Sequence, residues 1–208
     1  MPFPDDRFQQ KAFVQLGVAR LVGKRKIVAQ LKRNIVFESL ASASSIYEVG
    51  LRLHEDSKVN QTAIALEVMY FLLHSLNRQT TRKDGSKALQ AALFDPVASR
   101  VVEAFARILA ALKDDPKDRI AAAISDVLYL RELEYCKIPE LLGSLHEGLT
   151  GHNSVEFQTV VRISTDCGFP RDAIFQAATE NSILESLRRL QFPENARAME
   201  TLRGPPPN

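Results

Sequence analysis

The sequence predicts an all-α protein, folded as a single-domain multi-helix bundle. Three observations lead to this prediction. The stretch from Thr62 to Leu76 is apolar on nearly every side of a helical wheel, which is typical of a buried helix. Prolines precede several other segments with helical patterning. Strand signals are almost absent, since the β-branched runs at 27–28 and 35–37 lie in charged, helix-compatible surroundings.

The expected helices form one domain over residues 1–203. They cover residues 5–22, 24–33, 35–54, 60–79, 86–93, 96–113, 116–136, 139–149, 154–167, 170–190 and 193–203, and neighbours in this series are free to merge. The tail 204–208, Gly-Pro-Pro-Pro-Asn, cannot be helical, and we expect it to be disordered.

The first helices form a basic N-terminal arm over residues 1–33. The arm contains eight Lys and Arg residues but only two acidic residues, Asp5 and Asp6, so the rest of the chain is mildly acidic. Apolar positions alternate with the basic ones; they are Phe8, Phe13, Leu16, Leu21, Val22, Ile27, Val28 and Leu31. Gly17 and Gly23 weaken a free-standing helix, so packing must hold the arm in place. We expect it to cover the core; a dimer contact is the next interpretation, and a membrane surface the least favoured.

The helix near 60–79 is expected to be buried at the centre of the bundle. The segment Ser39–Ser45 before it contains only small side chains apart from Leu40. Small residues let a neighbouring helix approach closely, and the helix at 60–79 is the expected neighbour; a space for a ligand is the alternative.

Proline and capping residues mark the helix starts of the second half. Pro96, Pro116, Pro139, Pro170 and Pro193 each precede a plausible helix, where a missing N–H costs nothing. Asp95 and Asp115 are expected N-caps, and Asn153 with Glu156 resembles a capping box.

The composition is that of an ordinary globular protein. The chain of 208 residues has a net charge of +2, which gives no bulk electrostatic reason to bind nucleic acid or an anionic membrane. No stretch is long and apolar enough to span a membrane, and no secretory signal is apparent. Cys136 and Cys167 form neither a disulfide framework nor a zinc site, and we expect both to be buried, reduced thiols of a cytoplasmic protein.

Glu67 and His74 are the candidate ligand or polar-network residues. They lie seven residues apart and therefore on one face of the helix near 60–79. A carboxylate and an imidazole side by side are able to bind a metal or exchange protons. A solvated stripe and a buried hydrogen-bond network are the two competing interpretations. The Glu-x-x-His pattern typical of bundle metal sites is absent from the sequence.

Residues 160–180 resemble a helix-turn-helix unit. Gly168 is expected to make the turn, Ser164 to lie where the helices cross, and the apolar positions are Ile163, Cys167, Phe169, Ile174 and Ala177. In a DNA-binding unit Arg171 and Gln176 would contact bases. Asp172 and Glu180 would face the phosphates, so nucleic-acid binding is disfavoured against a plain helical hairpin.

No phosphate-binding loop, dinucleotide fingerprint or nucleophile elbow occurs in the sequence. We therefore predict no catalytic residue, metal ligand or cofactor. The expected function is that of a non-catalytic helical interaction or adaptor protein that associates with itself. A DNA-binding regulator using residues 160–180 is the first alternative, and a metal or small-ligand bundle around Glu67 and His74 is the second.

Overall fold

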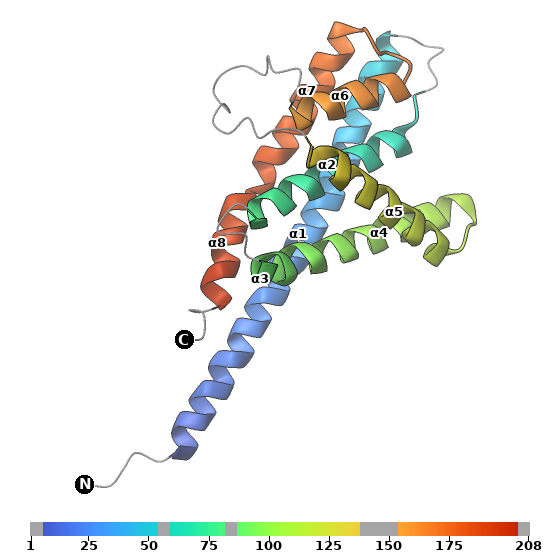
Figure 1. Ribbon diagram of the computed structural model, residues 1–208. Coiled ribbons are helices and arrows are strands. Elements are labelled where there is room, and N and C mark those ends of the chain that lie inside the picture. The colour runs from blue at the N-terminus through green and yellow to red at the C-terminus, as the bar shows by residue number, and fades with distance from the viewer. Residues whose placement is uncertain (1–5, 54–58, 82–86, 138–153, 204–208) are drawn as a thin grey trace.

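The computed structural model describes residues 6–53, 59–81, 87–137 and 154–203, and within these ranges all regular structure is helical (Figure 1). The helices are α1 (Asp6–Leu53), α2 (Gln61–Thr81), α3 (Lys87–Leu89), the π-helix η1 (Gln90–Phe94), α4 (Asp95–Lys113), α5 (Lys117–Tyr135), α6 (Val155–Asp166), α7 (Ala173–Leu190) and α8 (Phe192–Arg203). The predicted all-α class is confirmed. The expected helix at 139–149 and the tail at 204–208 lie outside the described residues.

Helix α1 merges the three helices expected over residues 5–54 into one of 48 residues, about 72 Å long at 1.5 Å per residue. No proline interrupts it, and isolated glycines lower helix stability without ending a helix. Figure 1 shows its N-terminal part extending past the other helices. Within the arm expected at 1–33, Val28 and Leu31 belong to the bundle core, whereas Leu21 and Val22 are exposed. Among residues 20–33, the part of the arm whose side chains the structure describes, the residues that join the core thus lie toward the C-terminal end.

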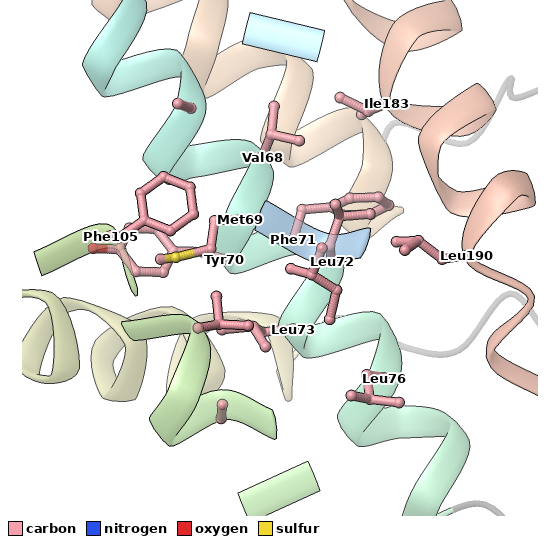
Figure 2. Packing of buried hydrophobic residues seen from close by; sticks show 14 of the residues in the cluster. Val68, Met69, Tyr70, Phe71, Leu72, Leu73, Leu76, Phe105, Ile183 and Leu190 are labelled. Atoms are coloured by element: carbon pink, nitrogen blue, oxygen red, sulfur yellow. The ribbon is translucent and has the colours of Figure 1, made fainter. Parts of the chain in front are cut away.

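Helix α2 is buried along most of its length. Val68, Met69, Phe71, Leu72 and Leu73 have no exposed surface. Because they point to different sides of α2, the helix needs neighbours all round, and it contacts α1, α5, α6 and α8 as well as η1. Figure 2 shows this packing, with Phe105 of α4 and Ile183 and Leu190 of α7 nearby. Each large apolar side chain buried in this way contributes about 1.5–3 kcal/mol to folding.

A small polar cluster joins α1 to α7. The Ser186 hydroxyl donates a hydrogen bond to the buried Glu38 carboxylate at 3.0 Å and lies 2.6 Å from the Ser42 hydroxyl, which donates to the Ser182 carbonyl at 3.4 Å. The small side chains of segment 39–45 thus also allow α7 to pack closely on α1. The sequence did not indicate this neighbour. Arg189 of α7 lies 3.6 Å from Glu38 and balances its charge.

Helix α4 begins at Asp95 with Pro96 in its first turn, close to the predicted start, but no break separates it from the preceding helix. Helices α3, η1 and α4 follow one another without a gap, and Asp95 is helical rather than an N-cap. The N–H of Asp95 bonds the carbonyl of Gln90, five residues back, in a π-type turn. This wider turn accommodates Pro96, which has no N–H to donate and would crowd the preceding turn of a regular α-helix.

Three other helix starts differ from expectation. The N-cap of α5 is Pro116 rather than Asp115. Helix α7 begins after Pro170, because the Asp172 carboxylate accepts hydrogen bonds from the N–H groups of Ile174 and Phe175, both at 2.9 Å. At the start of α6, the Ser154 hydroxyl accepts from Phe157 N–H at 3.0 Å; Asn153, the expected cap, lies outside the described residues.

Within the described ranges, no helix combines the length and the apolar character needed to cross a bilayer.

Of Gly23 and Gly50, the two glycines of α1 whose surroundings the structure describes, Gly50 is predicted to tolerate a methyl group less well. A Cβ there would lie 2.9 Å from Val59 Cγ2 and 3.3 Å from the Phe175 ring. Gly50→Ala should lower the free energy of unfolding by about 1–2 kcal/mol, because overcrowding outweighs the gain in helix propensity. Urea unfolding measures this change. Gly23→Ala is the matched control: its Cβ would meet only the flexible tip of Leu202, at 3.0 Å, and it should be neutral or stabilising. A Gly50→Ala protein as stable as wild type would contradict the packing.

Candidate functional site

Glu67 and His74, the two residues predicted on one face of α2, are both buried, with 7% and 2% of their surface exposed. This burial rules out the solvated stripe. A buried charge or imidazole requires partners, because removing such a group from water is costly unless its hydrogen bonds are replaced. The partners come from α5 and α6, which pack on this side of α2.

Glu67 is held by two arginines. Both its carboxylate oxygens accept hydrogen bonds from Arg131 of α5, one of them from Nε at 3.1 Å and the other from an Nη group. Arg162 of α6 places its Nε 3.6 Å from Glu67 Oε2. Burial acts to lower the pKa of Arg131, but the hydrogen bonds and charge of Glu67 outweigh it and raise the pKa. A two-pronged arginine–carboxylate pair is the strongest form of ion pair available to side chains.

Glu134 joins the two arginines from the outside. Its Oε2 accepts a hydrogen bond from Arg162 at 2.8 Å and one from Arg131 at 3.3 Å. Glu134 is half exposed, so this end of the network reaches the surface. The result is a row of alternating charges that ties α2, α5 and α6 together.

His74 lies two helical turns after Glu67 on α2 and belongs to a second part of the network. Its Nδ1 is 3.0 Å from Oε2 of Glu132, which also accepts a hydrogen bond from Asn77 at 3.0 Å. A carboxylate oxygen in this position needs a donor, so Nδ1 carries a proton. His74 Nε2 and Glu132 Oε1 are buried without a hydrogen-bond partner among the residues described. The amide of Gln90 extends the chain to Asn77 at 2.9 Å.

Two tyrosines close the network on its apolar side. Burial raises the pKa of Tyr70 and of Tyr135 to about 12, so both hydroxyls stay protonated at neutral pH. The Thr159 hydroxyl donates to the carbonyl of Val155, so it accepts from the Tyr135 hydroxyl at 3.1 Å. The Tyr135 ring also packs against the His74 imidazole, with centroids 4.9 Å apart. These tyrosines shield the network from water rather than supply a base.

The arrangement neutralises its own charges. The carboxylates of Glu67, Glu132 and Glu134 all accept hydrogen bonds from side chains of the network. Within the described ranges no group of three or more His, Cys, Asp or Glu residues is placed to hold a metal ion. Among the described residues, one cavity lies between α1 and α4 and another on α7, and neither is lined by Glu67 or His74.

Arg131, Glu132 and Arg162 are network residues that sequence reasoning missed. They lie more than 50 positions from Glu67 and His74, so no local spacing connects them. The available signal was the charged run Arg131–Glu134 directly before the apolar Tyr135, in a helix whose apolar residues follow no clear stripe.

The helix-turn-helix resemblance at 160–180 is correct for the turn and incorrect for part of the apolar face. Gly168 makes the turn with a positive φ of 84°, and Ser164 is fully buried. Ile174 is 66% exposed, and Ala177 is also exposed. The buried face of α7 is formed by Phe175, Thr179 and Ile183 instead.

Of the two residues expected to read bases, Arg171 is exposed, and the Gln176 amide donates to the Pro170 carbonyl at 2.9 Å. Asp172 caps α7 with its carboxylate. Gln176 and Asp172 are therefore engaged in holding the start of the helix.

The cysteine prediction is correct for Cys167 and wrong for Cys136. Cys167 is a buried free thiol, and Cys136 is an exposed one, since it follows the end of α5 where the chain leaves the helix.

Comparison of the chain with known protein families, with curated proteins and with solved structures found no match. The interpretation of the site therefore depends on its own geometry.

The Glu67–Arg131 pair is predicted to stabilise the fold far more than a surface ion pair does. Arg131→Ala leaves a buried carboxylate with only the more distant Arg162, which should lower the free energy of unfolding by about 2–4 kcal/mol. Arg107→Gln is the matched control, because it breaks the exposed Arg107–Glu103 pair and should cost less than about 1 kcal/mol. Urea unfolding of both variants measures the difference. Equal losses would show that Glu67 is not buried as described.

Cys167 is predicted to resist alkylation. Burial raises the pKa of its thiol from about 9 to about 11. At pH 8 its thiolate fraction should thus be roughly a hundredfold below that of an ordinary thiol. Because the folded state holds this proton more tightly than the unfolded state, the stability that Cys167 contributes falls as the pH rises from about 9 to about 11. Iodoacetamide labelling followed by peptide mass spectrometry should show Cys136 modified well before Cys167. Similar rates would contradict the burial of Cys167.

Proposed function

We propose that this protein is a non-catalytic helical interaction protein that associates with itself through residues 6–22 of α1, which we term the projecting segment. The observation that carries the proposal is the exposure of apolar side chains where α1 leaves the bundle. Leu21 is 49% exposed and Val22 is 44% exposed. Both lie on a helix that continues past every described neighbour (Figure 1).

Gly23 is the last point of α1 with a described contact to the bundle. The side chain of Leu202, at the end of α8, lies 3.0 Å from the position of a Gly23 Cβ. Helix α8 ends at Arg203, one residue after Leu202. The projecting segment is 17 residues long, which corresponds to about 25 Å of helix.

A packing partner would stabilise the projecting segment, because most helical stability in proteins comes from the packing of an apolar face. The sequence of the segment adds Phe8, Phe13 and Leu16 to the two exposed residues. A second copy of the chain offers the same surface, and a two-fold pair is the commonest way to bury such a face.

The buried network supports binding rather than catalysis. Its carboxylates and arginines are engaged with one another, which leaves the outer surface as the part of the molecule that meets other molecules. A cytoplasmic location is part of the proposal, because Cys136 and Cys167 are free thiols and a reducing compartment keeps them so.

Sedimentation equilibrium tests the proposal. We expect the full chain to form dimers at micromolar concentration. Leu21→Ser combined with Val22→Ser should shift it to monomer by removing exposed apolar surface at the contact. Added salt should strengthen the wild-type dimer, because Arg7, Lys11 and Arg20 of the two copies repel each other.

Leu130→Ser with Leu133→Ser is the matched control. These leucines of α5 are 54% and 45% exposed, so the change in surface is similar at a distant place. It should leave the dimer intact. A wild-type chain that stays monomeric at high concentration, or a dimer lost equally in both double variants, would refute self-association through the projecting segment.

A further inference from the structure

A basic groove lies between α1 and α4. Its volume is about 730 Å³, and the charged residues that line it are Lys26, Lys32, Arg33, Arg100, Arg107 and Glu103. Five cations and one carboxylate meet here in a protein whose overall charge is only +2. The groove is therefore far more positive than the molecule as a whole.

The single carboxylate does not neutralise the groove. Glu103 accepts hydrogen bonds from Arg107 and, at 3.3 Å, from Lys117 of α5. Hydrogen bonds from these two cations hold the pKa of Glu103 below its usual value, so it stays charged and engaged. Lys26, Lys32, Arg33 and Arg100 have no acidic partner among the residues described. The fold thus leaves four cations available to an anionic ligand.

The cations repeat along both helices. Lys26 and Arg33 lie seven residues apart on α1, and Arg100 and Arg107 lie seven apart on α4. Seven residues are two helical turns, so each pair shares one face and spans about 10 Å. Between the members of the pairs the groove is lined by the small side chains Ala29 and Ala104, which permit a close approach.

The same face of α1 carries exposed apolar side chains beyond the groove. Phe37 and Leu40 follow Arg33 at helical spacing and are 62% and 39% exposed. Exposed large apolar residues beside a charged groove are typical of the anchors of protein–protein interfaces. Nucleic-acid backbones offer no apolar partner of this kind.

We infer that the groove between α1 and α4 binds an acidic, amphipathic helix of a partner protein. Carboxylates two turns apart on such a helix match the spacing of the cations, and apolar residues further along it pack on Phe37 and Leu40. A nucleic acid fits less well, because its sugar-phosphate backbone offers no apolar partner for the exposed Phe37 and Leu40.

This inference goes beyond self-association and involves other residues. The groove is formed by the bundle, whereas the projecting segment precedes Gly23. Binding of an acidic helix should weaken with salt, and self-association should strengthen with it. The two proposals can therefore be tested independently. Groove variants should leave the dimer unchanged, and Leu21→Ser with Val22→Ser should leave peptide binding unchanged.

Fluorescence anisotropy with three probes tests the inference on the full chain. The first probe is a labelled alanine-based helical peptide with glutamates at seven-residue spacing and leucines on the same face. The second has the same composition with the glutamates spread over all faces. The third is a short DNA duplex of random sequence. We expect the first peptide to bind more tightly than the other two.

Arg33→Gln with Arg100→Gln should weaken binding of the first peptide on the order of tenfold, and Phe37→Ser should weaken it several-fold. Arg119→Gln with Arg197→Gln is the charge-matched control; both arginines are exposed and lie outside the groove, so binding should stay within about twofold. All four arginines are exposed, so these variants should fold normally. Equal binding of the two peptides, tighter binding of DNA, or equal loss in both double variants would overturn the inference.

Discussion

The burial of Glu67 is the constraint on which the rest of the structure depends. Helix α2 is surrounded by other helices, yet it carries a carboxylate and an imidazole in its interior-facing surface. An unpaired charge there would cost several kcal/mol, so the chain must bring opposite charges to it. Arg131 and Arg162 do so, and α5 and α6 are thereby fixed against α2. A purely apolar contact would be less selective, because apolar surfaces pack in more than one register.

This constraint separates two roles within the molecule. The network pairs Glu67 of α2 with Arg131 of α5 and Arg162 of α6, and the buried Tyr70 and Tyr135 lie beside it. Helix α1, in contrast, packs on α2, α4, α7 and α8 with one face and leaves part of its surface exposed. Its remaining surface carries the projecting segment, one wall of the basic groove and the exposed Phe37. The features that point to binding thus gather on one long helix that a rigid bundle supports.

The sequence predicted the fold class because helical periodicity and proline positions are local signals. Local signals did not predict the features that depend on tertiary packing. Asp95 has the sequence context of an N-cap, but a π-type turn joins η1 to α4 and leaves Asp95 inside a continuous helix. The spacing of Glu67 and His74 places both on one face of α2, yet nothing local connects them to Arg131, Arg162 and Glu132, which reach them only in the folded chain. The groove was also beyond prediction, because its two walls lie some 70 positions apart.

The central claim is that the bundle needs the buried charges of the network to be paired, and that the surface of α1, not the network, performs the binding. The most direct test replaces Glu67→Leu and Arg131→Met together and measures both the unfolding free energy and the dimer dissociation constant. Apolar groups of similar size often replace a buried ion pair at little cost, so the free energy should stay within about 2 kcal/mol of wild type. The dissociation constant should not change. A stably folded double variant that no longer dimerises would contradict the claim, since the network would then take part in binding itself.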